Sequence, residues 1–123
     1  MKTLKILLFT LLIIVYIKGE DYSYDKLIDY LKQTGIYNIL VTVNNNFGND
    51  ITIDVCQRIV QSYTCYDVVR NYIGPPSPRP QPYPGGPTYT RPTMREILTD
   101  TNNFLILAAN MDFNDLMELV NSY

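Results

Sequence analysis

All eight prolines of the 123-residue chain lie in one segment, residues 74–92, which reads GPPSPRPQPYPGGPTYTRP. Proline fixes φ at about −65° and has no backbone donor, so the alternating prolines from Pro76 to Pro84 exclude a helix and an interior strand. We therefore expect a semi-rigid, exposed proline-rich loop. The ordered structure must come from residues 20–73 and 93–123, which together are long enough for one domain with one core.

The first 19 residues have the pattern of a secretory signal peptide. Lys2 and Lys5 precede an apolar run at residues 6–17, and Lys18 ends that run. A run of about twelve residues is shorter than the roughly 20 that a membrane-spanning helix needs. We expect cleavage after Gly19 and secretion of the rest of the chain, with an uncleaved signal anchor as the alternative. No later segment is apolar enough to cross a bilayer, so we expect no membrane insertion after cleavage.

Charge and composition narrow the classes of partner and chemistry. Loss of residues 1–19 would remove three of the ten basic side chains and none of the twelve acidic ones, for a net charge near −5. This balance disfavours nucleic acid and anionic membrane surfaces as partners. The chain has no histidine, which removes the commonest general base and the commonest zinc ligand. We expect no metal and no cofactor, and an enzyme that relies on carboxylates and tyrosines alone is the remaining catalytic alternative.

Cys56 and Cys65 are the only cysteines. In an exported chain an even number of cysteines predicts one intramolecular disulfide, with unpaired or intermolecular thiols as the alternative. Their spacing is not that of a Cys-x-x-Cys redox motif. Closing a loop of about ten residues would contribute on the order of 2.5 to 3 kcal/mol to stability.

The first block opens with a helical pattern followed by an apolar run. Apolar side chains recur at the i, i+3, i+4, i+7 spacing of one helical face, at Tyr24, Leu27, Ile28 and Leu31. Ser23 is the expected N-cap and Gly35 the expected left-handed C-cap. Residues 37–43 (YNILVTV) are rich in β-branched side chains and nearly continuous in apolar character, which predicts a strand covered on both faces.

The rest of the first block is less regular. Residues 50–61 fit a second helix capped by Asp50, because one side of it would carry Val55, Cys56, Ile59, Val60 and Tyr63. The alternation of apolar and polar residues from Ile51 to Val55 fits a strand instead, which stays the alternative. Residues 66–70 are predicted as a second strand, with a helix over residues 65–73 as the alternative.

The second block gives clearer signals. Thr93 and Glu96 have capping-box spacing directly after the last proline, which predicts a short helix to about Thr99. Residues 104–109 (FLILAA) are predicted as another buried strand. Asp112 is the expected N-cap of a last helix, with an apolar face formed by Phe113, Leu116, Met117, Leu119 and Val120.

Helices that alternate with strands predict a parallel sheet built from right-handed crossovers. We therefore expect an α/β fold, a small three-layer α/β sandwich with a short, Rossmann-like parallel sheet of about three strands. The expected organisation is a signal peptide at 1–19, a first α/β block at 20–73, the proline-rich loop at 74–92 and a second block of the same single domain at 93–123.

Two stretches, LIDYLKQTGIYNILVTV at 27–43 and FLILAANMDFNDLMEL at 104–119, resemble pieces of the extracellular amino-terminal region of insect ionotropic receptors. Those regions are similar to periplasmic-binding-protein lobes. In such lobes a helix precedes a strand such as YNILV, and a strand such as FLILA ends in an Asn and Asp turn before the next helix. The resemblance implies an α/β receptor lobe that holds a ligand. Because no pore or membrane segment accompanies it here, it implies at most a truncated, secreted lobe.

The predicted sheet also predicts a ligand site. In open parallel sheets, ligands lie beyond the carboxyl ends of the strands, at the point where neighbouring crossovers leave on opposite faces. The residues expected there are Asn44, Asn45, Asn46, Asn110 and Asp112, joined by Asn71 and Tyr72 if residues 66–70 form a strand. Asn offers both a donor and an acceptor, and helix starts present unpaired amides, which suits a small polar ligand. Ordinary turn formers and helix caps are the alternative interpretation.

The paired acidic residues and the tyrosines are expected to have structural rather than chemical roles. Asp25 with Asp29, and Asp112 with Asp115 and Glu118, fall on the sides of helices away from the apolar stripe, which is typical of solvated faces. The eleven tyrosines are dispersed along the chain, so we expect no single stacking platform.

These features predict a secreted, non-enzymatic binding module that holds a small-molecule ligand or a partner protein. The alternative is a secreted effector, of salivary or venom type, that acts on a host protein through the proline-rich loop. PxxP spacing at Pro75–Pro78 and Pro84–Pro87 supports the alternative, whereas a plain spacer is the simpler interpretation of the loop.

Overall fold

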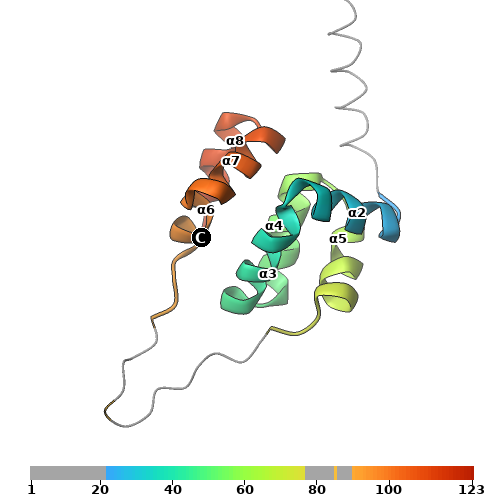
Figure 1. Cartoon of the computed structure of the whole chain (residues 1–123), viewed down its shortest axis with the longest axis horizontal. Coiled ribbons are helices and arrows are strands. Elements are labelled where there is room, and N and C mark those ends of the chain that lie inside the picture. Colours follow the sequence, from blue (N-terminus) through green and yellow to red (C-terminus); the bar gives the residue numbers. More distant parts are fainter. Residues whose placement is uncertain (1–21, 77–84, 86–89) are drawn as a thin grey trace, which may run out of the picture.

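The computed structural model describes residues 22–76, 85 and 90–123. These residues form seven α-helices and one π-helix, and no strand occurs among them (Figure 1). In chain order the elements are α2 (Tyr24–Thr34), α3 (Ile36–Phe47), α4 (Asn49–Val60), α5 (Thr64–Asp67), the π-helix η1 (Val68–Ile73), α6 (Met94–Thr99), α7 (Thr101–Asn110) and α8 (Phe113–Asn121). The predicted three-layer α/β sandwich is therefore wrong, because the part of the chain that the structure describes is a helical bundle. The predicted signal peptide, residues 1–19, lies outside the described residues.

The first predicted strand, residues 37–43, lies in α3. Its buried side chains recur at helical spacing, at Ile36, Ile39, Leu40 and Val43. A β-branched residue costs only a few tenths of a kcal/mol in a helix. Burial of one Leu or Ile side chain contributes about 1.5–3 kcal/mol, so the packing of this face outweighs the local preference for a strand.

The second predicted strand, residues 104–109, lies in α7. A strand covered on both faces would bury all of these side chains, whereas Leu107 is the only buried residue of α7 and Leu105 is 62% exposed. The helix begins directly after α6, where the amide of Phe104 donates to the carbonyl of Asp100 at 2.8 Å. Because a single residue separates the two helices, the chain has no room for an extended crossover between them.

The helix predicted at residues 50–61 is confirmed as α4, and the strand alternative for this region is excluded. Its N-cap is Gly48 rather than Asp50. Gly48 has φ +87° and ψ 177°, a backbone conformation that is nearly restricted to glycine. Residues 66–70 form no strand, because α5 continues into η1 with Val68 and Val69 buried.

The turn between α2 and α3 packs directly against α7. Gly35 has φ +85° and closes α2 in the predicted left-handed conformation. A Cβ atom at this position would lie 2.8 Å from Cδ1 of Ile106. Glycine therefore serves both the backbone geometry of the turn and the close approach of α7.

Two predicted N-caps are confirmed in the second block. The side chain of Thr93 accepts a hydrogen bond from the amide of Glu96 at 3.1 Å, as in a capping box. Asp112 accepts from the amide of Asn114 at 3.0 Å and starts α8. Ser23 occupies the N-cap position of α2 without a capping hydrogen bond from its side chain.

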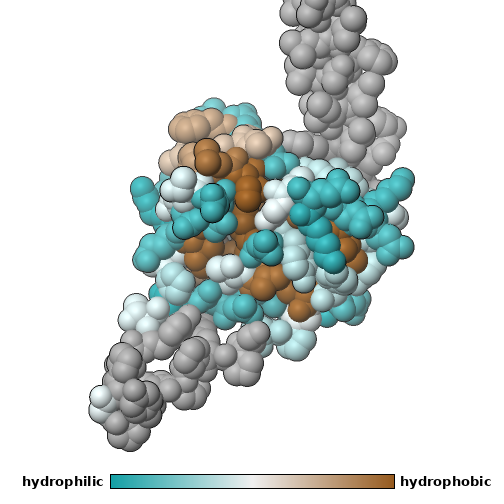
Figure 2. Space-filling view, in the orientation of Figure 1, coloured by the Kyte–Doolittle hydropathy of each residue, from teal (hydrophilic) through white to brown (hydrophobic). Residues whose placement is uncertain are grey.

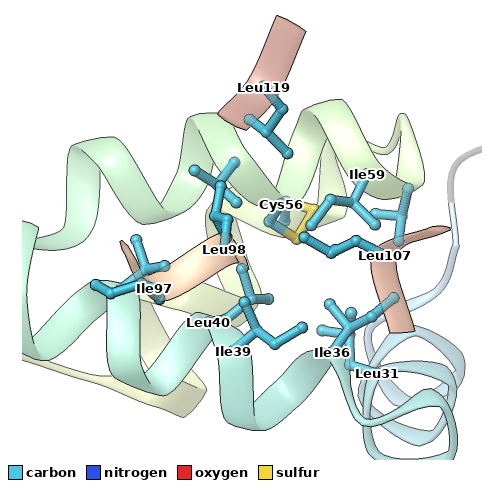
Figure 3. Packing of buried hydrophobic residues seen from close by; sticks show 14 of the residues in the cluster. Leu31, Ile36, Ile39, Leu40, Cys56, Ile59, Ile97, Leu98, Leu107 and Leu119 are labelled. Carbon is cyan, nitrogen blue, oxygen red and sulfur yellow. A yellow bond between two sulfur atoms is a disulfide. The ribbon is translucent and has the colours of Figure 1, made fainter. Parts of the chain in front are cut away.

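The core forms around α3, which contacts α2, α4, α6 and α7. Leu40 and Ile59 of the first block share one buried cluster with Leu98, Leu107 and Leu119 of the second block (Figure 3). In Figure 1, α6, α7 and α8 lie together beside α3 and α4. The blocks on either side of the proline-rich segment are thus joined by one hydrophobic core.

The predicted disulfide is confirmed. Cys56 in α4 and Cys65 in α5 are bonded, with their Cα atoms 5.9 Å apart. Both residues are fully buried, so the bond fastens α5 to the inner side of α4.

Gln61 ends α4 in a left-handed conformation, with φ +54° and ψ 48°. Among the described residues it is the only one other than glycine with a positive φ. This conformation brings the Cβ atom of an ordinary residue too close to its own backbone, at a cost of about 1 kcal/mol.

Replacement of both cysteines, Cys56→Ala with Cys65→Ala, should lower the free energy of unfolding by about 2.5–3 kcal/mol, because the unfolded chain is no longer restricted. Urea unfolding of the oxidised parent and the double variant measures the difference. Mass spectrometry first verifies that the parent gains two hydrogens on reduction. A stability loss below about 1 kcal/mol would show that the crosslink contributes little.

Gln61→Gly should raise the free energy of unfolding by up to about 1 kcal/mol, since glycine adopts the left-handed conformation without strain. Gln57→Gly, one turn earlier in the interior of α4, should instead lower it by about 1 kcal/mol. Thermal unfolding of the two variants compares the same substitution in two backbone conformations. Equal destabilisation by both would refute the left-handed C-cap.

Candidate functional site

Asn44 links the last turn of α3 to two other elements. Its side chain is 1% exposed and its Nδ2 donates to the carbonyl of Gly74 at 3.0 Å. Its Oδ1 accepts from Asn49 Nδ2 at 2.6 Å and from Thr52 Oγ1 at 3.4 Å. Both ends of the amide are therefore engaged inside the protein, where they hold the end of η1 against α3 and α4.

The same turn of α3 also holds the chain after the proline-rich segment. Arg91 donates from Nη1 to the carbonyl of Asn46 at 3.2 Å, and its guanidinium lies 4.7 Å from the centre of the Phe47 ring. Asn46 itself donates from Nδ2 to the carbonyl of Thr42 at 2.9 Å. Because Gly74 is bound by Asn44 on this same turn, the proline-rich segment begins and ends at one place in the fold. Most of it, residues 77–84 and 86–89, lies outside the described residues, as do both predicted PxxP spacings in part.

The structure does not bring the predicted ligand residues to one place. Asn45 lies half-buried on the same turn as Asn44, at the end of α3. Asn110 lies at the end of α7, where its Oδ1 accepts from the hydroxyl of Tyr30 in α2 at 2.7 Å. Asn110 thus contacts α2, whereas Asn44 lies about 12 Å along the axis of α3 from Ile36, the first residue of that helix. No sheet edge among the described residues unites these side chains.

Asn110 and Asp112 do line a common groove, between the end of α4 and the start of α8. The groove has a volume of about 190 Å³ and is also lined by Arg58, Gln61 and Asp115. Small-molecule sites usually have volumes of about 300–1,000 Å³ and bury most of the ligand among apolar side chains. A neighbouring hollow that shares Arg58, Gln61 and Asp115 with this groove has a volume of about 300 Å³, at the lower limit of that range. Because exposed polar side chains form much of both linings, the region favours a surface contact over an enclosed ligand.

The Tyr22 and Tyr30 rings stack beside this region, with their centres 5.4 Å apart. Burial raises the pKa of both phenols above the ordinary value. Tyr30 therefore stays protonated at neutral pH and donates to Asn110.

A second aromatic cluster joins α2, α3 and η1. The ring of Tyr72 meets those of Tyr37 and Tyr24 edge to face, at centre distances of 5.8 and 6.4 Å. Lys32 Nζ lies 5.1 Å from the centre of the Tyr72 ring and 5.7 Å from that of Tyr37. Its hydrogen bond with Tyr72 raises the pKa of Lys32, so the ammonium stays charged. Three of the dispersed tyrosines thus meet edge to face, while Tyr22 and Tyr30 form a stacked pair.

The acidic side chains noted in the sequence are all exposed, namely Asp25, Asp29, Asp112, Asp115 and Glu118. No group of three or more His, Cys, Asp or Glu side chains within residues 22–76 and 90–123 is arranged to hold a metal ion. The chemistry of these carboxylates is therefore that of surface charges.

A group of exposed apolar side chains lies on α7 and at the start of α8. We use the name α7–α8 surface for Leu105, Ala108, Ala109 and Phe113, all of which are exposed. Leu105 is 62% exposed and Phe113 is 67% exposed. In Figure 2, apolar side chains gather over the end of the molecule formed by these helices. Single exposed apolar residues are common, whereas a group of them is a candidate for an interaction site.

The chain region that carries the α7–α8 surface is acidic. From Glu96 to the last residue the sequence has five Asp and Glu residues and no Lys or Arg. Asp100 precedes α7, whereas Asp112 and Asp115 lie at the start of α8, and all three are exposed. The neighbouring cation across the groove, Arg58, lies 3.5 Å from Asp54 on its own helix.

Sequence inspection could have found this surface. The six apolar residues of FLILAA at 104–109 are consecutive, and each residue of a helix is rotated by about 100° from the last. Six consecutive positions cover the whole circumference, so a helix here must leave some of them away from the core. The strand interpretation concealed this signal.

Comparison with protein-family models, with curated proteins and with solved structures finds no match. The strands that the resemblance to insect ionotropic receptors implied, YNILV and FLILA, are helical in α3 and α7. Within the described ranges, no helix is long and apolar enough to cross a membrane.

Asn44→Ala should lower the free energy of unfolding by about 2–3 kcal/mol, because it leaves the buried polar groups of Asn49 and Gly74 with fewer partners. Asn38→Ala, at an exposed position of the same helix, is the control and should cost less than about 0.5 kcal/mol. Urea unfolding measures both. Equal, small effects would show that the Asn44 network does not fasten η1 to α3.

Proposed function

We propose that the chain is a secreted, non-enzymatic binding protein that contacts a partner protein through the α7–α8 surface. The observation that carries this proposal is the exposure of Leu105, Ala108 and Ala109 on α7 and of Phe113 at the start of α8, in a bundle whose other Leu and Ile side chains are buried or partly buried. Contact with an apolar partner surface would remove these side chains from water and stabilise the complex.

Export is supported by two features. The first 19 residues combine a basic start with a short apolar run. The buried bond between Cys56 and Cys65 is of the kind that persists in oxidising compartments.

A protein partner suits the geometry better than a small ligand. The groove at Asn110 and Asp112 is small, about 190 Å³, and the buried Asn44 is occupied by contacts within the protein. By contrast, the α7–α8 surface is exposed, apolar at its centre and polar around its border, which is the general anatomy of a protein interface.

A second candidate is the effector hypothesis, in which the proline-rich segment contacts a host protein. The attachment of Gly74 and Arg91 to the same turn of α3 favours it, because a segment fixed at both ends is displayed from one place. Exchange of residues 75–87 for a Gly/Ser linker tests this candidate, since only the effector hypothesis makes the segment necessary for binding.

The main proposal is tested with Leu105→Gln combined with Phe113→Gln, which removes the exposed apolar groups without changing charge. We expect the tagged parent to recover a partner protein from the extracellular fluid of its source organism and the double variant to lose it at least tenfold. Both positions are exposed, so the free energy of unfolding should change by less than about 1 kcal/mol.

The matched control is Tyr63→Gln with Tyr66→Gln, which removes two exposed aromatic side chains, one of them 81% exposed, from another part of the molecule. The control should recover the same partner as the parent. Equal recovery by all three proteins would place the contact elsewhere and overturn the proposal.

A further inference from the structure

We infer that the partner presents to the α7–α8 surface an amphipathic helix with an apolar centre and a basic border. This inference rests on the proposed function and adds the chemistry of the partner. It combines the exposed apolar group around Leu105 and Phe113 with the acidic residues around it.

The charge distribution of this region indicates which charges the border of the partner carries. Asp100 is exposed before α7, Asp112 and Asp115 are exposed at the start of α8, and the 28 residues from Glu96 to Tyr123 hold no Lys or Arg. Arg58 of α4 lines one groove with Asp112 and Asp115, but it also lies 3.5 Å from Asp54, so acidic groups outnumber basic ones there. Charges at the rim of an apolar contact favour partners of opposite charge and repel partners of like charge. Lys or Arg at the border of the partner therefore meets a region with an excess of negative charge.

The same charges disfavour the other occupants of an apolar face. In a symmetric dimer of this chain the surface would face its own copy, so the carboxylates of Asp100, Asp112 and Asp115 would approach one another. An anionic lipid surface would meet the same repulsion. A basic segment of another protein is the occupant that these residues favour.

The surface shape of α7 suits a helical partner in particular. Leu105 projects beside the small side chains of Ala108 and Ala109, which lie three and four residues later on the same face. A large side chain next to small ones gives the ridge and groove into which a second helix packs, at an axis distance of about 8–10 Å.

The test uses the full oxidised protein and two synthetic helices. Both probes are fluorescein-labelled 15-residue peptides with Leu at i, i+3, i+4 and i+7, and their other positions are Lys in one and Glu in the other. We expect the Leu/Lys helix to bind at least tenfold more tightly than the Leu/Glu helix by fluorescence anisotropy, and its affinity to fall as salt rises.

Two charge variants localise the effect. Asp100→Asn with Asp112→Asn and Asp115→Asn should weaken binding of the Leu/Lys helix about tenfold, and Asn keeps the cap of α8. The control Asp25→Asn with Asp29→Asn and Asp67→Asn makes the same change in net charge on α2 and α5. It should weaken binding less than about threefold.

The outcomes separate this inference from the proposed function. Equal affinity for the two helices, or equal effects of the two charge variants, overturns the inference of a basic partner. The apolar contact still stands in that case if Leu105→Gln with Phe113→Gln abolishes binding. Binding that survives the Gln double variant overturns the proposed function itself. Failure of both helices to bind overturns the inference. A dimer in sedimentation that is lost in the Gln double variant identifies a second copy as the occupant and also overturns it.

Discussion

The burial of α3 is the interaction on which the rest of the structure depends. This helix contacts α2 and α4 of the first block and α6 and α7 of the second, and its side chains Ile36, Ile39, Leu40 and Val43 are all buried. Most of the proline-rich segment that joins the blocks lies outside the described residues. Within the described residues, apolar packing against α3 holds the second block in place.

The polar end of α3 complements its apolar body. Asn44 binds the carbonyl of Gly74, and Arg91 binds the carbonyl of Asn46, so the chain before and after the proline-rich segment attaches to a single helical turn. Contacts within the protein therefore account for the Asn side chains at positions 44, 46 and 49 without the need for a ligand. On α7, by contrast, apolar side chains such as Leu105 are exposed within the described residues.

Local chemistry predicted several local features correctly although the fold class was wrong, because caps and crosslinks depend on a few neighbouring residues. The left-handed Gly35, the caps at Thr93 and Asp112 and the disulfide all hold. The predicted sheet was wrong because short apolar runs fit a buried strand and a buried helix equally well until their packing is known. The predicted ligand site depended on that sheet. In the structure, the Asn residues of that site lie on two different helices, α3 and α7. The apolar surface on α7 was missed for the same reason.

The helical state of α3 and α7 is the central claim, because both the core and the α7–α8 surface depend on it. Nuclear magnetic resonance assignment of the oxidised protein tests it most directly. We expect Cα chemical shifts displaced to the helical side throughout Ile36–Phe47 and Thr101–Asn110, with amide contacts between successive residues. Shifts displaced to the strand side at residues 37–43 and 104–109, with cross-strand contacts between the two segments, would contradict the bundle and remove the surface on which the proposed function rests.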